Sequence, residues 1–132
     1  MSRENLEILW VDDDEDFLLQ QRIVLERSGF RVTVAHSRLE AEQAVADWKP
    51  AIALVDVMMD HPDDGLTLCH HLRQRYPDLP ILLVTAMTAE TGVSLDPTLA
   101  GANSWVKANA VLTKPIRLEQ LTREILRCLP VG

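Results

Sequence analysis

The chain has 132 residues, of which 20 are acidic and 13 are Lys or Arg, so its formal net charge is −7. Hydrophobic residues make up 47% and charged residues 25%, which is ordinary for a folded domain. A chain of this length supplies enough apolar surface for one hydrophobic core, so we expect residues 1–132 to form a single domain. The acidic balance, without a separate cluster of basic residues, argues against direct binding to nucleic acid.

The sequence contains no run that is long and apolar enough to cross a membrane. Its longest apolar runs, Ala51–Val55 and Ile81–Val84, reach about a quarter of the length needed. The first residues, Met1–Val11, lack the long apolar stretch of a signal peptide. The two cysteines, Cys69 and Cys128, lie far apart in sequence, and we predict that both are buried free thiols. We therefore expect a cytoplasmic protein with no membrane partner.

In the first part of the chain, short apolar runs alternate with amphipathic segments, which is typical of parallel strands joined by helices. Leu6–Val11 and Arg31–Ala35 are predicted strands, and Glu15–Ser28 is a predicted helix between them. Gly29 stands where a helix often ends with a positive φ. A second helix is predicted to begin at the capping box Ser37-Arg38-Leu39-Glu40. Its inward face is predicted from helical spacing to carry Ala41, Ala44, Val45 and Trp48.

The same alternation continues to the end of the chain, with one interruption. The predicted strands are Ala51–Val55, Ile81–Thr85 and the short Ala110–Leu112, and a helix is predicted over about Leu66–Tyr76. A last helix is predicted from one apolar face formed by Leu118, Leu121, Ile125 and Leu129. The interruption is Met87–Asn109, which shows no sustained helical period and is predicted to be an irregular loop with at most a short helix.

Five predicted strands joined by helices indicate a doubly wound α/β fold, in which ligands bind beyond the carboxyl ends of the strands. The residues at those ends are Asp12, Asp13, Asp56, Thr85 and Lys114. With a strand order of 2-1-3-4-5, the first and third strands are neighbours about 4.8 Å apart. A lysine side chain from the fifth strand is long enough to approach the same pocket. The five side chains are therefore expected to converge.

The charges in this pocket determine the chemistry that it can perform. Two carboxylates about 5 Å apart repel each other by roughly 3 kcal/mol at an effective dielectric constant near 20. A hard divalent cation such as Mg²⁺ relieves that repulsion, and Lys114 adds a second positive group. The hydroxyl of Thr85 can donate to a phosphoryl oxygen. This set predicts phosphoryl transfer onto Asp56, whereas Asp14–Asp16 are interpreted as acids that complement the dipole of the first helix.

The sequence resembles the response-regulator receiver domains of two-component signal transduction over essentially its whole length. The motifs that carry this resemblance are Ile8–Asp13, Leu54–Met59, Gly65-Leu66, Leu83–Ala86 and Thr113–Pro115. It implies a flavodoxin-like parallel sheet of order 2-1-3-4-5. It also implies a signalling domain that assists its own phosphorylation and dephosphorylation, with Mg²⁺ or Mn²⁺ as its cofactor, and not a conventional enzyme.

The resemblance also implies a role for each residue of the pocket. Asp56 is the implied phospho-acceptor, and a sensor histidine kinase or a histidine phosphotransfer protein is the implied donor, as in a phosphorelay. The implied metal-binding groups are Asp13, Asp56 and the carbonyl of Met58, with Asp12 acting through water. The implied phosphoryl-binding groups are Thr85, the backbone N–H of Ala86, and Lys114. We expect one receiver domain over residues 1–132, no output domain, and a downstream protein target whose identity the sequence does not reveal.

Three departures from the family pattern leave an alternative open. The segment from Asp56 to Gly65 is slightly longer than usual, and Asp60 stands where a proline is common. The segment between Thr85 and Lys114 is several residues longer, so the fourth helix is expected to be irregular or replaced by a loop. Val111 replaces an aromatic residue that takes part in the family's conformational switch. The alternative is a receiver-like protein-interaction module that works without phosphorylation.

A third hypothesis is an aspartate-nucleophile phosphohydrolase of the haloacid dehalogenase type. Such enzymes use a second acid two residues after the nucleophile, whereas Met58 stands at that position here. The sequence therefore disfavours this hypothesis.

Overall fold

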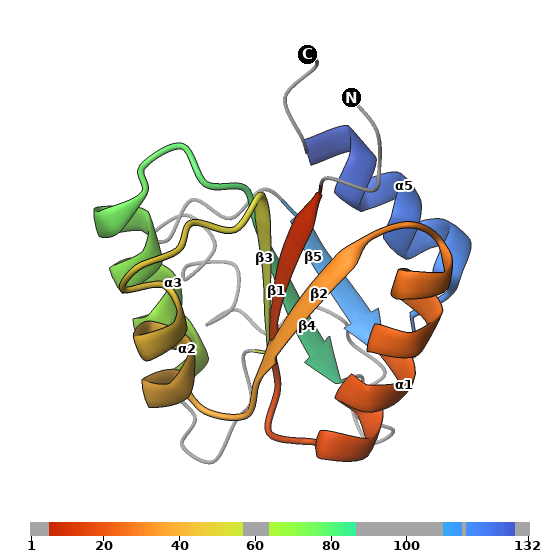
Figure 1. Cartoon of the computed structure of the whole chain (residues 1–132), viewed down its shortest axis with the longest axis horizontal. Coiled ribbons are helices and arrows are strands. Elements are labelled where there is room, and N and C mark those ends of the chain that lie inside the picture. Colours follow the sequence, from red (N-terminus) through yellow and green to blue (C-terminus); the bar gives the residue numbers. More distant parts are fainter. Residues whose placement is uncertain (1–5, 57–63, 87–109, 115, 129–132) are drawn as a thin grey trace.

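A computed structural model of the chain describes residues 6–56, 64–86, 110–114 and 116–128. Five parallel strands form one sheet in the order β2-β1-β3-β4-β5, with helices on both faces (Figure 1). The strands are β1 (Glu7–Val11), β2 (Arg31–Ala35), β3 (Ile52–Asp56), β4 (Ile81–Ala86) and β5 (Ala110–Lys114). The described helices are α1 (Glu15–Arg27), α2 (Arg38–Ala44), α3 (Asp64–Arg75) and α5 (Leu118–Cys128). The predicted doubly wound fold and its strand order are confirmed.

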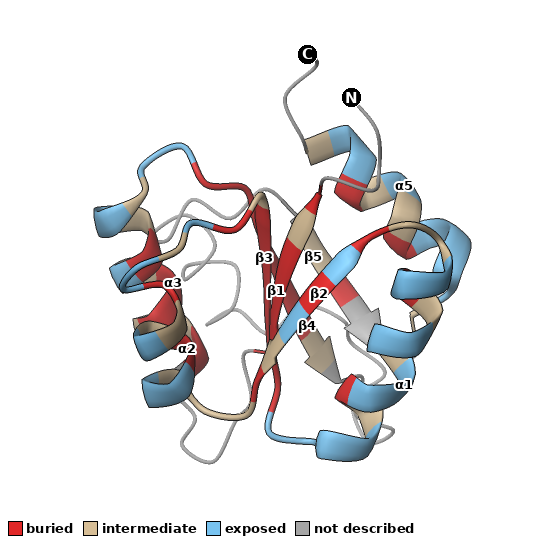
Figure 2. Ribbon diagram, in the orientation of Figure 1, coloured by how far each residue is buried: buried red, intermediate tan, exposed pale blue. Residues whose placement is uncertain are grey.

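The sheet lies between two layers of helices, and its central strands are buried on both faces (Figure 2). Along β1, Ile8 and Trp10 pack into the hydrophobic cluster beneath α1 and α5. Leu9 and Val11 alternate with them and pack into the cluster beneath α2 and α3. Burial on both faces explains why the predicted strands are continuous apolar runs.

Helix α1 has a clear beginning and a clear end. The Oδ1 atom of Asp14 accepts a hydrogen bond from the backbone N–H of Phe17 at 3.0 Å, which caps the amino end of the helix. The helix ends at Arg27, one residue before the predicted Ser28, and Gly29 follows with φ of 100°. Because positive φ strains any residue that has a Cβ atom, glycine suits this position, as predicted.

Helix α2 is shorter than its apolar spacing predicts. It ends at Ala44, so Trp48 lies beyond the helix, although it still packs against the same cluster. The chain after α2 is held by two side chains from the end of α3, those of Arg75 and the following Tyr76, which donate hydrogen bonds to backbone carbonyl groups there. The guanidinium of Arg75 and the hydroxyl of Tyr76 donate to the carbonyl of Val45 at 3.1 and 2.9 Å. These donors satisfy carbonyl groups that a longer helix would have bonded internally.

A second polar contact joins α2 to α3. Arg38 donates to both carboxylate oxygens of Glu42 at 3.2 and 3.1 Å, and Nδ1 of His71 lies 2.5 Å from the same carboxylate. Burial raises the pKa of Glu42, but the hydrogen bonds from His71 and Arg38 outweigh this effect, so the pKa lies below its ordinary value. The carboxylate therefore stays ionised and holds the two helices together.

The remaining element boundaries differ from the predictions in detail. Helix α3 begins at Asp64 instead of Leu66, and β5 continues to Lys114 instead of ending at Leu112. The segment predicted to be irregular, Met87–Asn109, lies outside the described residues. In the part of the chain that is described, no helix is both long enough and apolar enough to cross a membrane.

The two cysteines are free, as predicted, but differ in burial. Cys69 is buried, and this burial raises the pKa of its thiol to about 12, so the thiol is uncharged at neutral pH. Cys128 is only partly buried, so the prediction of burial is wrong for this residue, which lies near the end of an amphipathic helix.

The backbone at Gly29 gives a direct test of this fold. We expect Gly29→Ala to lower the free energy of unfolding by about 1–2 kcal/mol, because alanine must adopt a left-handed conformation there. Urea denaturation measures this change. Gln20→Ala, at an exposed position within α1, is the control and should change the free energy by less than about 0.5 kcal/mol. Equal stability of Gly29→Ala and the unchanged protein would contradict the positive φ.

Candidate functional site

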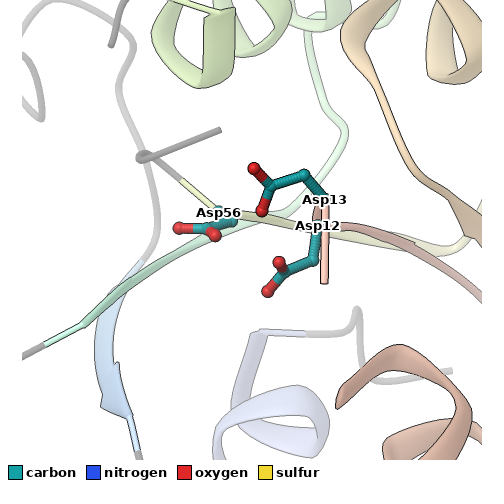
Figure 3. Close-up of side chains that lie close together, drawn as sticks. All are labelled: Asp12, Asp13 and Asp56. Atoms are coloured by element: carbon teal, nitrogen blue, oxygen red, sulfur yellow. The ribbon is translucent and has the colours of Figure 1, made fainter. Parts of the chain in front are cut away.

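Three acidic side chains come together at the carboxyl ends of two neighbouring strands. Asp12 directly follows β1, and Asp56 is the last residue of β3. Because Val11 pairs with Val55 in the parallel register, Asp12 and Asp56 continue side by side. One carboxylate oxygen from each of Asp12, Asp13 and Asp56 lies within 4.8 Å of the others (Figure 3). The convergence of these three predicted site residues is thus confirmed.

The burial of these acids is unusual. Asp12 is 0% exposed and Asp56 is 3% exposed, whereas Asp13 is exposed to solvent. Among the residues that the structure describes, Asp12 and Asp56 are the buried polar or charged ones. Burying a carboxylate is costly, and acids this close also repel each other by roughly 3 kcal/mol. The cluster therefore works against folding stability, which is typical of a functional site.

The backbone holds Asp12 in place on both sides. Its N–H donates to the carbonyl of Ala35 in β2 at 3.1 Å, so the strand pairing continues one residue past β1. Its Oδ1 atom accepts a hydrogen bond from the N–H of Asp14 at 2.9 Å. The sequence predicts that Asp14 mainly complements the helix dipole, and in the structure its side chain also caps α1 while its backbone N–H orients Asp12. The preference for aspartate before a helix indicates the cap, and the tendency of aspartate to accept the N–H two residues further on indicates the bond to Asp12.

The predicted phosphoryl-binding residues lie at the same edge of the sheet. Asp56 pairs with Val84, so Thr85 is one residue further along β4. In the next pair of strands, Ala86 lies opposite Lys114. The backbones of Thr85, Ala86 and Lys114 therefore lie at the same edge of the sheet as the acidic cluster, with Lys114 two strands from Asp56. The carbonyl of Met58 and the side chain of Lys114 lie outside what the structure describes.

The acidic cluster suits a hard divalent cation. Mg²⁺ binds oxygen atoms at about 2.0–2.1 Å, so opposite ligands of its octahedron are about 4.2 Å apart. The carboxylate oxygens of Asp12, Asp13 and Asp56 already lie within 4.8 Å of one another. In the described part of the chain, no other three His, Cys, Asp or Glu side chains bring their ligand atoms this close together. The neighbouring His70 and His71 therefore do not belong to a second cluster of this kind.

Sequence comparisons define the family of the chain. The model of the response regulator receiver domain family matches residues 8–126. Response regulator MprA from Mycobacterium ulcerans is 38% identical over 119 residues, which cover 89% of this chain and 47% of that protein. Response regulator MprA from Mycobacterium tuberculosis H37Rv is also 38% identical over 119 residues. The chain spans about half the length of the curated relatives it matches.

Solved structures agree with this assignment. A two-component response regulator from Clostridium difficile is 25% identical, with a TM-score of 0.79 and coverage of 93% of this chain and 97% of that chain. Chemotaxis protein CheY4 from Vibrio cholerae, 23% identical, shares the fold with a TM-score of 0.82 over 94% of this chain and 98% of that chain. The chain therefore belongs to the response regulator receiver domain family of two-component systems. Members of this family are signalling domains that generally bind Mg²⁺ at an acidic pocket and act with histidine kinases and downstream effectors.

Repulsion within the acidic cluster leads to a stability prediction. In EDTA, we expect Asp13→Asn to raise the free energy of unfolding by about 1 kcal/mol, because it removes one of three neighbouring negative charges. Urea denaturation measures the change. Asp47→Asn, at an exposed acid outside the cluster, should change the free energy by less than about 0.5 kcal/mol. A loss of stability in Asp13→Asn would contradict the prediction, because it would mean that repulsion is not the dominant effect of this carboxylate.

Proposed function

We propose that this receiver domain accepts a phosphoryl group on Asp56 from a histidine of a sensor histidine kinase or a histidine phosphotransfer protein, in a reaction that needs Mg²⁺ or Mn²⁺. One observation carries the proposal. Two buried acids, Asp12 and Asp56, and the exposed Asp13 meet within 4.8 Å at the ends of neighbouring strands. Such a concentration of negative charge favours a divalent cation, and a carboxylate beside that cation can act as a nucleophile toward phosphorus.

Each residue of the pocket has a proposed role in this reaction. A carboxylate oxygen of Asp56 forms the new P–O bond while the P–N bond of the donor breaks, and the imidazole leaves with the electron pair and is protonated. A bound cation supplies positive charge to the phosphoryl oxygens. Asp13, Asp56 and the carbonyl of Met58 would hold it directly, and Asp12 would hold it through water. Asp13 suits direct coordination because it is exposed at the surface of the cluster.

Further proposed groups bind the phosphoryl oxygens. Thr85 would donate its hydroxyl, Ala86 its backbone N–H, and Lys114 its ammonium group. The register of the strands supports this assignment, because Ala86 lies opposite Lys114 and Thr85 is one residue beyond the partner of Asp56. The phosphorylated domain would then signal through a changed surface to a downstream protein target. We propose that it does so in the cytoplasm.

A second candidate function is binding to a protein partner without phosphorylation. The observation that favours it concerns Val111, which replaces the family's switch aromatic. Val111 pairs with Leu83 in the sheet and packs, partly buried, against the cluster beneath α2 and α3. The β-branched side chain of valine has few rotamers. It is therefore poorly suited to change conformation when Asp56 is phosphorylated.

Intact-mass analysis tests the proposed phosphorylation. The chain is incubated with acetyl phosphate, which stands in for the histidine donor, and with Mg²⁺. We expect the mass of one phosphoryl group to be added to the unchanged protein. We expect no addition in Asp56→Asn, because the nucleophile is lost, or in EDTA, because the cation is removed. Asp47→Asn, at an exposed acid outside the cluster, should be modified like the unchanged protein.

Absence of any adduct has two explanations, and a second ligand separates them. Beryllofluoride imitates a phosphoryl group on a carboxylate and is not hydrolysed. Binding that depends on both Mg²⁺ and Asp56 would show that the pocket can hold a phosphoryl group on Asp56, so the missing adduct is explained by rapid loss. Failure of both experiments would contradict the proposal and favour the phosphorylation-independent module.

A further inference from the structure

The turn that carries Asp12 and Asp13 is linked to the hydrophobic core by a short series of contacts. The carboxylate of Asp12 accepts the N–H of Asp14 at 2.9 Å, and the carboxylate of Asp14 accepts the N–H of Phe17 at 3.0 Å. The ring of Phe17 meets the ring of Trp10 edge-on, with their centroids 5.6 Å apart and their planes at 83°. Trp10 lies in β1, two residues before Asp12.

These contacts form a closed ring of interactions. The aromatic contact joins Trp10 to Phe17, and hydrogen bonds from backbone N–H groups join Phe17 to Asp14 and Asp14 to Asp12. The backbone at the end of β1 connects Asp12 to Trp10 again. Each link has a narrow range of geometry, because hydrogen bonds weaken with angle and aromatic pairs favour edge-on contact. The amino end of α1 therefore cannot shift against the end of β1 without breaking a link. The direction of the Asp12 carboxylate depends on that relative position.

Trp10 is an unexpected residue at a core position. It is 0% exposed, and its indole Nε1 has no hydrogen-bond partner in the described structure. A buried donor without a partner lowers stability, and an aliphatic residue in the same strand would avoid this loss. Local features that disagree with stability are expected beside functional sites. The wide indole ring is the part of Trp10 that contacts Phe17.

We propose that Trp10 and Phe17 are positioning residues for Asp12, the acid that would hold the cation through water. Their edge-on contact fixes the first turn of α1 relative to β1. The N–H of Asp14, which lies just before that turn, then orients the carboxylate of Asp12 through its hydrogen bond. Neither ring carries an oxygen ligand for a hard cation, so both would act through Asp12. This inference rests on the proposed function, because it assumes that the acidic cluster binds Mg²⁺.

Calorimetric titration of the metal-free chain with Mg²⁺ tests the inference. We expect Phe17→Leu to weaken Mg²⁺ binding about tenfold, as is typical when a group that orients a metal ligand is removed. Phe17→Tyr keeps the ring and should restore an affinity close to that of the unchanged protein. Leu25→Val is the matched control, because Leu25 is buried in the same cluster at the other end of α1. It should lower stability and leave Mg²⁺ affinity unchanged.

Hydrogen exchange in EDTA provides a readout that does not need the metal. The N–H of Asp14 should exchange faster in Phe17→Leu than in Leu25→Val when both are compared at equal stability in urea. Trp10→Leu should have the same effect on this amide as Phe17→Leu, since both remove one contact.

The possible outcomes separate the inference from the proposed function. If the unchanged protein binds no Mg²⁺, the proposed function fails and the inference fails with it. If it binds Mg²⁺ and Phe17→Leu binds equally well, or no more weakly than Leu25→Val, the inference alone is overturned. Unchanged exchange of the Asp14 amide in Phe17→Leu would also overturn it.

Discussion

The mutual repulsion of three carboxylates is the constraint on which the rest of this structure depends. Asp12, Asp13 and Asp56 are brought close because β1 and β3 are adjacent parallel strands that end at the same edge. A loosely packed sheet would let these acids separate into water. Here the two strands are buried on both faces, and their hydrophobic clusters supply the stability that the acids remove. The apolar core is therefore what allows the acidic site to exist.

The alternation of side chains along β1 gives two consecutive acids different environments. Ile8 and Trp10 face one layer of helices, and Leu9 and Val11 face the other. Asp12 follows Trp10 in this order and is buried, whereas Asp13 is exposed. One acid is thus held by backbone hydrogen bonds while its neighbour remains accessible to solvent. A single strand end thus provides both a fixed acid and an accessible one, because successive side chains of a strand point to opposite faces.

Much of the fold could be predicted from sequence, because the spacing of apolar residues indicates which segments are strands or helices and which of their faces are buried. The five strands follow from short apolar runs, and the order 2-1-3-4-5 that the family resemblance implies brings Asp12, Asp13 and Asp56 together at one edge of the sheet. The early end of α2 could not be predicted, because it depends on Arg75 and Tyr76, about thirty residues away in sequence. The contact between Trp10 and Phe17 was missed for a similar reason, since periodicity identifies the buried face of an element but not which side chains meet there.

The dependence of α2 on α3 has a consequence for the way the protein opens. A helix of seven residues is too short to be stable in water by itself, because nucleation costs more than so few hydrogen bonds return. The carbonyl of Val45, directly after the last residue of α2, accepts hydrogen bonds from Arg75 and Tyr76, and Glu42 of α2 is bonded to His71. Local opening of α3 would therefore release α2 at the same time. We expect α2 and α3 to open together as one unit of local unfolding.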